Sequence, residues 1–309
     1  MPDPKHPLKI GTRGSPLALA QAHEVRDRLG SAWGLEPAAF EVVAISTHGD
    51  RVQDRSLRDL GGKGLFTGEL EAALFAGAVD IAVHSTKDTA VVQPVGLVLD
   101  CFLPREDVRD AFVSPRHRAI ADLPQGAVVG TSSLRRRAQL LVRRPDLQVV
   151  EFRGNVQTRL RKLNDGVAEA TFLAMAGLNR LGLMGTIPAV PVPVDDLLPA
   201  VAQGAIGVER RADDAVAARL LEVLHDDRTG QCLAAERAFL AELDGSCQTP
   251  IGGLAEIDGG TLRLRGEILR TDGSEVQSGE ACGAVEDGPG MGVELARDLL
   301  SRAGPGFFA

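Results

Sequence analysis

The chain has 309 residues and a formal net charge of −8, from 42 acidic and 34 basic side chains. Its length predicts two or three domains with hydrophobic cores, and a hydrophobic share of 44% excludes a wholly disordered chain. No apolar run approaches the roughly 18 residues of a membrane helix, and the acidic total argues against nucleic acid or another polyanion as ligand.

The amino-terminal part alternates between strands and helices. Three short apolar runs are typical of buried strands, at residues 8–12, 40–46 and 79–84. Between the first two, Ser15 is a predicted N-cap with Pro16 at the first helical position, and Gly30 is expected to end the helix. A second helix is predicted at 67–76, capped by Thr67. Strands that alternate with single helices predict a mainly parallel sheet covered on both faces.

Residues 48–65 follow a different pattern. They have no sustained apolar period and carry four glycines among mixed charges. A structureless loop of this length is usually functional. We interpret it as an active-site lid, with a plain surface insertion as the alternative.

A second alternating unit begins near Asp110. Its predicted strands are 127–130, 147–152 and 171–174, and its predicted helices are 132–144, 155–163 and a short one that ends at Leu183. The next segment, residues 187–199, holds four prolines and is interpreted as a connection between domains.

The pattern changes again after Leu224. A helix is predicted at 232–243 and a closing helix at 292–303. Between them lie alternating runs at 251–257, 261–269 and 277–284, separated by Asp-Gly turns. This order predicts a small antiparallel sheet.

Basic residues concentrate between Thr131 and Lys162. This segment holds nine basic and two acidic residues, a net charge of +7, which leaves −15 for the rest of the chain. A local field of this sign concentrates an anionic ligand whatever the total charge. A solvated helix face is the alternative, and nucleic acid is disfavoured because only Phe152 interleaves the cluster.

Three predicted strand-to-helix junctions combine hydroxyl, amide and arginine side chains. They are Thr12-Arg13-Gly14-Ser15, Thr131-Ser132-Ser133-Leu134-Arg135-Arg136 and Arg153-Gly154-Asn155. Helix N-termini bind carboxylates and phosphates, and arginine adds a two-pronged donor. None of the junctions matches a nucleotide-binding glycine motif. Together they predict a polyanion site.

Polar residues also follow the predicted strand 79–84. Ligands sit beyond the carboxyl ends of strands in open parallel sheets, so Asp88, next to Lys87, is a candidate catalytic carboxylate. A helix-capping aspartate is the alternative, and His84 is expected to be a hydrogen-bonded strand-end residue rather than a base.

Four cysteines lie far apart and form no CxxC pair, so neither disulfides nor a zinc site is predicted. Cys101, Cys232 and Cys282 are expected to be inert. Cys247 lies in a loop among small and polar residues, which suits an accessible nucleophile or an attachment point. Reduced thiols, and residues 1–7 without an apolar signal core, favour a cytoplasmic protein.

These residues together resemble the porphobilinogen deaminase (hydroxymethylbilane synthase) family from Ile10 to the last helix. The resemblance rests on the following motifs, given in chain order: Thr12-Arg13, Ser15-Pro16-Leu17-Ala18, Gly61-Gly62-Lys63-Gly64-Leu65-Phe66, Asp80-Ile81-Ala82-Val83-His84-Ser85, Gly130-Thr131-Ser132-Ser133-Leu134-Arg135-Arg136, Arg153-Gly154-Asn155-Val156, Gln203-Gly204-Ala205, Cys247-Gln248 and Pro250-Ile251-Gly252. The chain departs from the family pattern at Gly14, Thr86, Thr89 and Ala90.

The resemblance implies an enzyme that joins four porphobilinogen molecules head to tail, releasing ammonia and finally hydroxymethylbilane. It implies Asp88 as the catalytic residue and a dipyrromethane cofactor attached to Cys247 through a thioether, with no metal. The residues that it implies for binding substrate and cofactor are Arg13, Ser15, Lys63, Phe66, Ser85, Lys87, Thr131, Ser132, Ser133, Arg135, Arg136, Arg153, Gly154, Asn155, Arg159 and Gln203.

The implied fold class is α/β. Two hinged, doubly wound α/β domains resembling periplasmic binding proteins are expected, plus a small α+β domain with an antiparallel sheet. The expected boundaries are 1–104 with 200–223, then 105–199, and last 224–309, which carries the cofactor cysteine. The resemblance also implies a monomer without nucleic-acid or membrane partners that hands its product to uroporphyrinogen-III synthase. A non-catalytic binding protein for a small anion is the rival interpretation.

Overall fold

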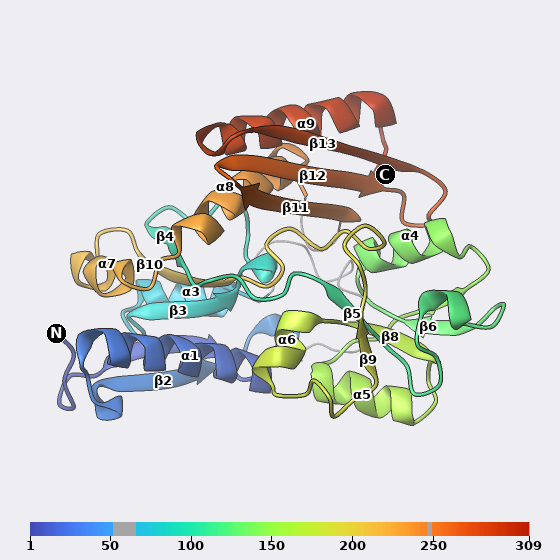
Figure 1. Ribbon diagram of the computed structural model, residues 1–309. Coiled ribbons are helices and arrows are strands. Elements are labelled where there is room, and N and C mark those ends of the chain that lie inside the picture. Colours follow the sequence, from blue (N-terminus) through green and yellow to red (C-terminus); the bar gives the residue numbers. More distant parts are fainter. Residues whose placement is uncertain (52–65, 246–248, 309) are drawn as a thin grey trace. The chain divides into compact units, whose positions relative to one another are not determined.

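The computed structural model describes residues 1–51, 66–245 and 249–308 (Figure 1). The chain divides into two compact units. In the described part, unit 1 comprises residues 1–51, 66–106 and 205–230, and unit 2 comprises 107–204, 231–245 and 249–308. Each unit is therefore built from segments far apart in the sequence.

Unit 1 contains one five-stranded mixed sheet. Its strand order is β2 (Phe40–Ile45), β1 (Leu8–Arg13), β3 (Ile81–Ser85), β10 (Ile206–Arg211) and β4 (Leu97–Phe102). Strand β1 pairs in parallel with β2 and β3, whereas β10 is antiparallel to β3 and β4. The helices of the unit are α1 (Pro16–Trp33), the short α2 (His48–Arg51), α3 (Gly68–Phe75) and α7 (Ala215–Glu222), with 3₁₀ turns at Pro37–Ala39 and Thr86–Asp88.

Helix α1 begins where the sequence predicted and ends later. The Ser15 hydroxyl accepts a hydrogen bond from the Ala18 amide, which is the expected N-cap contact. The helix continues past Gly30 to Trp33, so Gly30 as its end was wrong. It stops at Gly34, whose φ of 63° is the left-handed conformation of a C-cap glycine. The Trp33 indole N–H donates to the Leu220 carbonyl of α7, which helps to hold the additional turn.

The sheet of unit 1 is covered on both faces, as predicted. Ile81 and Val83 of β3 belong to the core cluster that contains residues of α1 and α7. Ala82, between them in sequence, belongs to the cluster that contains Leu70 and Leu74 of α3. This alternation follows from the two-residue period of a strand. Because β1 and β3 are parallel, Arg13 and Ser85 end at the same edge of the sheet.

Unit 2 contains a second five-stranded mixed sheet. Its strand order is β7 (Gln148–Val150), β6 (Val128–Gly130), β8 (Ala170–Ala174), β5 (Asp110–Val113) and β9 (Ala189–Pro191). Strand β6 is parallel to β7 and β8, and β5 is antiparallel to β8 and β9. The associated helices are α4 (Leu134–Arg143), α5 (Val156–Asn164) and α6 (Met175–Arg180), with a 3₁₀ turn at Ile120–Asp122. Strand β9 lies within the proline-rich segment, which is therefore more than a connection.

The carboxyl-terminal part of unit 2 is the predicted antiparallel sheet. Strands β11 (Ile251–Asp258), β12 (Thr261–Leu269) and β13 (Val276–Ala284) pair in sequence order. Helix α8 (Asp227–Glu242) precedes the sheet, and a 3₁₀ turn at Val285–Asp287 leads into α9 (Gly288–Ala303), which runs along it (Figure 1). The two helices approach closely at Gly292, where a side chain would meet the Ala235 carbonyl of α8.

Most predicted elements of both units are confirmed within a few residues. Strands β4, β5, β9 and β10 and helix α7 were not predicted, and the two larger sheets are mixed rather than mainly parallel. Thr67 precedes α3, but its side chain makes no capping hydrogen bond there. Within the described ranges, no helix combines the length and the hydrophobicity that a membrane crossing requires.

Candidate active site

A pocket in unit 1 is lined by side chains from the ends of β1 and β3 and the first turns of α1. Arg13, Ser15, Phe66, Ser85 and Asp88, all predicted site residues, contribute to its wall. Parallel strands end at one edge of the sheet, and the N-terminus of α1 follows directly from β1. This geometry brings Arg13, Ser15, Ser85 and Asp88 together as expected, and Phe66 joins them from the segment before α3.

Arg13 connects two other members of this pocket. Its Nη1 lies 3.9 Å from Oδ2 of Asp88, and its guanidinium carbon lies 4.3 Å from the centre of the Phe66 ring. The Asp88 side chain keeps 33% of its surface exposed. A partly exposed carboxylate at the wall of a pocket, close to a cation and an aromatic ring, is accessible to a ligand.

Behind the strand end, two polar pairs fix the neighbouring side chains. The Gln21 amide of α1 donates to the Ser85 hydroxyl at 2.9 Å, and the same hydroxyl lies 3.1 Å from the Gln21 amide oxygen. His84 Nε2 lies 3.0 Å from Oε2 of Glu209 on β10, with both side chains almost fully buried. His84 is therefore a hydrogen-bonded strand-end residue, as expected. Neither Gln21 nor Glu209 was singled out in the sequence.

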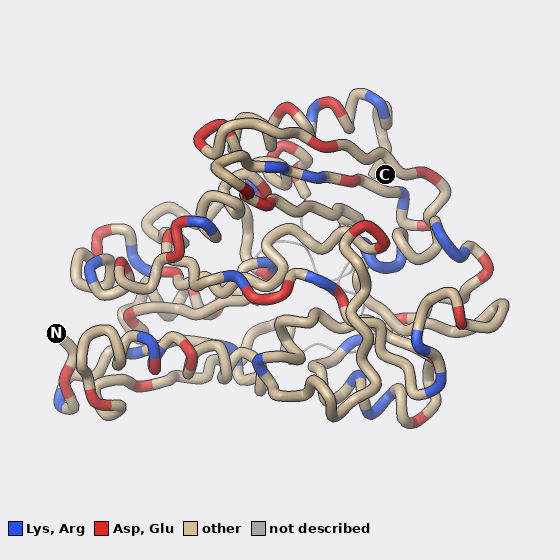
Figure 2. The backbone as a smooth tube through the Cα atoms, in the orientation of Figure 1, with Lys and Arg blue, Asp and Glu red and all other residues tan. Residues whose placement is uncertain are grey.

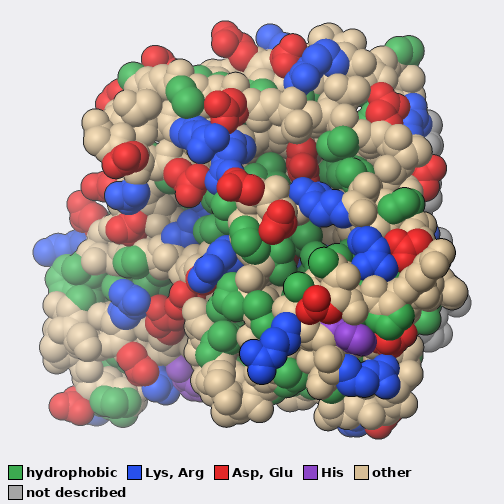
Figure 3. Space-filling model, turned by 45° about the vertical axis from the view of Figure 1, so that its right-hand side comes forward, with side chains coloured by type: hydrophobic (Ala, Val, Ile, Leu, Met, Phe, Trp, Pro, Cys, Tyr) green, Lys and Arg blue, Asp and Glu red, His purple; other side chains and the backbone are tan. Residues whose placement is uncertain are grey.

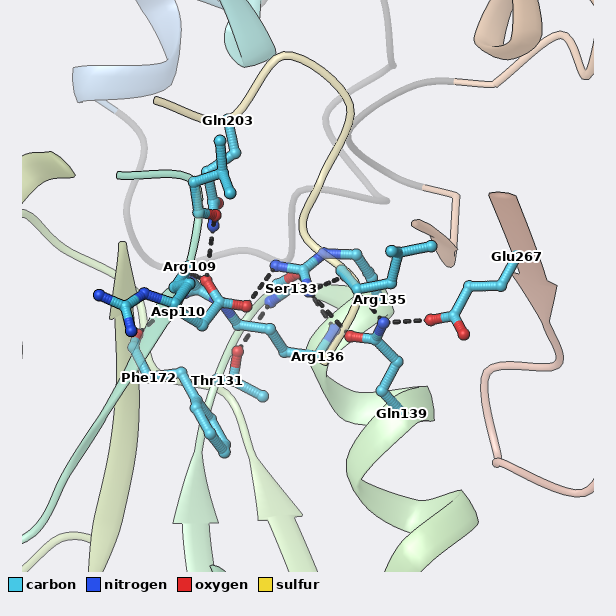
Figure 4. Close-up of polar contacts among 12 residues, drawn as sticks. Arg109, Asp110, Thr131, Ser133, Arg135, Arg136, Gln139, Phe172, Gln203 and Glu267 are labelled. Atoms are coloured by element: carbon cyan, nitrogen blue, oxygen red, sulfur yellow. Dashed lines mark hydrogen bonds and ion pairs between the residues drawn. The ribbon is translucent and has the colours of Figure 1, made fainter. Parts of the chain in front are cut away.

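Unit 2 holds a buried cluster of two arginines and one aspartate (Figure 4). Arg135 Nη2 donates to Oδ2 of Asp110 at 2.8 Å, and Arg136 Nη2 donates to Oδ1 at 2.7 Å. Arg135 and Arg136 are 4% and 5% exposed, and Asp110 is fully buried. Both arginines lie in the first turn of α4 and Asp110 begins β5, so a helix start and a strand start meet here.

The electrostatics of this cluster are set by burial and by mutual attraction. Burial alone would raise the pKa of Asp110, but the charges of Arg135 and Arg136 outweigh it and hold that pKa well below its usual range. Burial lowers the pKa of Arg135, and Asp110 opposes this effect. Asp110 is therefore a carboxylate at neutral pH, held between two guanidinium groups.

The hydroxyl residues around the start of α4 organise its backbone. The Ser133 hydroxyl accepts from the Arg136 amide as the N-cap, and the Thr131 hydroxyl accepts from the Ser133 amide (Figure 4). The Ser132 hydroxyl accepts from the Phe152 amide across to the segment after β7. All three predicted residues thus surround this helix start, and the two arginines continue from it.

The third predicted junction, before α5, contains an N-cap. The Asn155 side chain accepts from the Thr158 amide, and Arg159 Nε donates to the Gly154 carbonyl. Gly154 has a φ of 119°, and a side chain there would meet Thr158 at 2.6 Å, so this position requires glycine. Arg153 comes directly before this turn, and its carbonyl accepts from Lys162 Nζ.

Several predicted residues lie outside the described ranges. They are Cys247 and residues 52–65 of the predicted lid, which include Lys63. The first four residues of the predicted lid, 48–51, form α2. Lys87 is described and lies in the 3₁₀ turn after β3. Among the other cysteines, Cys101 and Cys232 are buried and Cys282 is exposed. Burial raises the pKa of the Cys101 thiol to about 12.

The charge distribution follows the sequence pattern. Figure 2 shows basic residues along α4 and α5, in the segment with a net charge of +7. On the face in Figure 3, basic and acidic side chains are interspersed, with no broad area of one sign. In residues 1–51, 66–245 and 249–308, no group of three or more His, Cys, Asp or Glu side chains is arranged to hold a metal ion.

Comparison with known proteins assigns the chain. Residues 8–219 match the model "Porphobilinogen deaminase, dipyromethane cofactor binding domain", and residues 230–301 match "Porphobilinogen deaminase, C-terminal domain". The chain belongs to the porphobilinogen deaminase family. The resemblance inferred from the motifs is thereby confirmed.

Relatives in this family align over nearly the whole chain. Porphobilinogen deaminase of Paracoccus denitrificans is 65% identical over 100% of this chain and 98% of its own length. The chloroplastic enzyme of Pisum sativum is 50% identical over 97% of this chain and 83% of its own length. Among solved structures, that of a periplasmic substrate-binding protein from Coxiella burnetii aligns with 74% of this chain and 96% of its own chain, at 16% identity and a TM-score of 0.42.

Sequence reasoning missed the partners of the predicted deaminase residues. Gln203 was predicted, and its amide donates to Asp110 Oδ1 and to the Val108 carbonyl. Asp110 itself was not predicted, although it organises both arginines. Gln139, one helical turn after Arg135, accepts from Arg135 Nη1 and donates to Glu267 of β12 (Figure 4). The i, i+4 spacing of Arg135 and Gln139 was the available signal.

Proposed function

We propose that the chain is an enzyme that joins four porphobilinogen molecules head to tail, releasing ammonia at each step and then hydroxymethylbilane, in tetrapyrrole biosynthesis. The observation that carries this proposal is the family match through residues 8–219 and 230–301, with 65% identity to the Paracoccus denitrificans relative. Because the match extends through both family domains, it supports the whole activity rather than binding alone.

The proposed substrate has two carboxylates per pyrrole, so the product gains negative charge at each step. We propose that Arg13, Arg135, Arg136, Arg153 and Arg159 bind these carboxylates, helped by the helix starts beside them. Supporting this role, Arg13 opens into a pocket, and the three helices involved begin with Ser15, Ser133 and Asn155 as N-caps. The further proposed binding residues are Lys63, Phe66, Ser85, Lys87, Thr131, Ser132, Gly154 and Gln203.

We propose that Asp88 stabilises the positive charge of the reacting pyrrole and transfers the proton that the reaction releases. When the C–N bond of the substrate breaks, its electron pair leaves with ammonia and the pyrrole becomes positively charged. A carboxylate beside the ring stabilises that charge. A second pyrrole then forms the new C–C bond through its α-carbon and loses the α-proton, which Asp88 accepts and passes to ammonia. Partial exposure in the pocket and the nearby Arg13 support this role.

The described residues fit a dipyrromethane cofactor. Arg135 Nε is buried and has no acceptor among the described residues, while Arg135 and Arg136 share the single carboxylate of Asp110. A carboxylated pyrrole chain would supply the missing acceptor. When bound, the cofactor provides the pyrrole α-carbon to which the first substrate is joined. We propose that Cys247 holds it through a thioether.

We also propose three domains with the boundaries 1–104 with 200–223, 105–199 and 224–309. The three separate sheets of the described residues support this division. We also propose that the chain acts as a monomer. Release of hydroxymethylbilane to uroporphyrinogen-III synthase and a cytoplasmic location remain predictions.

The experiment that tests this function is turnover of porphobilinogen by the purified chain. The proposal expects four ammonia molecules released for each hydroxymethylbilane formed. The rival anion-binding protein would bind porphobilinogen in equilibrium dialysis without releasing ammonia. Binding without ammonia release would therefore reject the enzyme and favour the rival.

A further inference from the structure

Asp110 is the common acceptor of the buried cluster in unit 2. Its Oδ1 accepts from Arg136 Nη2 at 2.7 Å, from Arg136 Nε at 3.2 Å and from the Gln203 amide at 2.9 Å, and its Oδ2 accepts from Arg135 Nη2 at 2.8 Å. Three hydrogen bonds therefore reach Oδ1 and one reaches Oδ2, so both carboxylate oxygens are held by protein donors. Asp110 is also completely buried, so no part of it remains for a ligand.

The other contacts of Arg135 and Arg136 are also with groups of the protein. Arg136 Nη1 donates to the Phe172 carbonyl, and Arg135 Nη1 donates to the Leu198 carbonyl and to the Gln139 side chain (Figure 4). Arg135 Nε, by contrast, has no acceptor among the described residues although it is buried. Protein acceptors therefore hold Nη1 and Nη2 of Arg135, whereas the N–H of its Nε has no acceptor among the described residues.

The buried donors of the cluster outnumber its acceptors. Arg135 and Arg136 share Asp110, Glu267 acts on Arg135 from β12, and the buried Nε of Arg135 still has no acceptor among the described residues. Both arginines lie in the first turn of α4, where the helix dipole disfavours cations. An acceptor at this N–H would complete the cluster, and Asp110 determines the orientation of the arginine donors.

From this geometry we propose that Asp110 is a positioning residue for ligand binding: it orients Arg135 and Arg136 so that their remaining N–H groups meet a carboxylate of the pyrrole chain. The inference rests on the proposed function and deepens it by assigning the residue that prepares the arginine pair. Asp110 itself touches no ligand, because its oxygens are occupied within the protein.

The test replaces Asp110 with Asn, which keeps the shape but removes the charge and places an N–H₂ group against one arginine. Asp110→Asn should lower the share of molecules that carry covalent cofactor, measured by intact mass. In the cofactor-bearing fraction, the KM for porphobilinogen should rise by about tenfold or more, with a smaller change in kcat. Thermal unfolding is followed in parallel, because loss of a buried ion partner also lowers Tm.

Asp107→Asn is the matched control. Asp107 lies three residues earlier and pairs with Arg109 at 2.6 Å, and the Arg109 side chain is 43% exposed. The control should keep the cofactor and the KM of the original chain. Asp110→Asn with full cofactor mass and a KM within twofold of the control would overturn the proposal, however far its Tm falls.

A second variant covers the case in which Asp110→Asn does not fold. Gln203→Met removes one donor to Asp110 and leaves both arginine contacts to it. It should raise the KM for porphobilinogen severalfold, and an unchanged KM would count against the positioning role. Failure of the proposed function is a different result, since the unmodified chain would then carry no cofactor and release no ammonia.

Discussion

Arg13 and Asp88 form an ion pair at 3.9 Å, which is too long for a hydrogen bond, and both side chains remain partly exposed. An exposed pair at this distance contributes little to folding stability. The arrangement instead places a carboxylate beside a cation at the wall of a pocket. Removal of the Asp88 side chain is therefore expected to slow the reaction and to leave the stability of the fold nearly unchanged.

Asp88→Ala should reduce ammonia release from porphobilinogen by about 10²- to 10⁴-fold, the usual contribution of a general acid or base. The far-UV circular dichroism spectrum and Tm should change little. Asp100→Ala is the matched control, because Asp100 is a 48% exposed carboxylate of the same unit that pairs with Arg210 away from the pocket. Turnover within tenfold of this control would remove Asp88 from the proposed role.

The number of free thiols reports the proposed thioether independently of activity. Alkylation after complete unfolding should label three of the four cysteines, since a thioether blocks Cys247. In the native protein, Cys282 should react before Cys101, because Cys282 is exposed whereas burial raises the pKa of the Cys101 thiol to about 12. Peptide mapping assigns each label. Labelling of all four thiols in unfolded protein is the contrary result.

Glu267 should make the folded state less stable as pH rises. Burial raises its pKa, and the Gln139 contact and the charge of Arg135 only partly oppose this. A carboxyl group with a raised pKa in the folded state stabilises the fold at low pH, and this contribution is lost as pH rises through that pKa. Glu267→Gln should therefore raise Tm at pH 8 and give no advantage at pH 4.

Thermal unfolding at both pH values measures this effect. Glu280→Gln is the control, because Glu280 is a 54% exposed carboxylate on the neighbouring strand and pairs with Arg263. Its Tm should follow the original chain at both pH values. An equal Tm change for Glu267→Gln at pH 4 and pH 8 would exclude the titration of Glu267 as the cause.

The contact between α8 and α9 depends on the absence of a side chain at Gly292. An added Cβ would lie 2.4 Å from the Ala235 carbonyl oxygen and 2.9 Å from the Phe239 amide nitrogen. Gly292→Ala should destabilise the fold by about 1–3 kcal/mol, as overpacking does. Gly290→Ala, in the same helix with open space around it, should be neutral or stabilising by up to about 1 kcal/mol. Denaturant titration compares the two, and equal stabilities would refute the packing argument.

Local sequence patterns predicted the elements that depend on neighbouring residues. The Ser15 cap and the Asp-Gly turns of the antiparallel sheet are encoded within a few positions, and the structure has them. Strand β10 was missed because its first four residues are all buried and its last three are charged. Its sequence therefore shows no apolar–polar alternation.

The residues of the candidate site also differ in whether the sequence predicted them. Arg135 and Arg136 were predicted because they stand next to each other at a recognisable helix start. Asp110 was not, since it lies 25 residues before Arg135 in a strand whose pattern is short and fully buried. A buried charge partner is recognised only when the fold brings it to the charge.

The intact mass of the purified chain, followed during exposure to limiting porphobilinogen, reports both the proposed cofactor and each condensation step. The starting mass should exceed that of the bare sequence by two porphobilinogen units less two ammonia molecules. Up to four further steps of one unit less one ammonia should follow, and every increment should be lost in Cys247→Ala. A mass equal to the bare sequence before and after substrate, or increments that persist in Cys247→Ala, would contradict the proposed function.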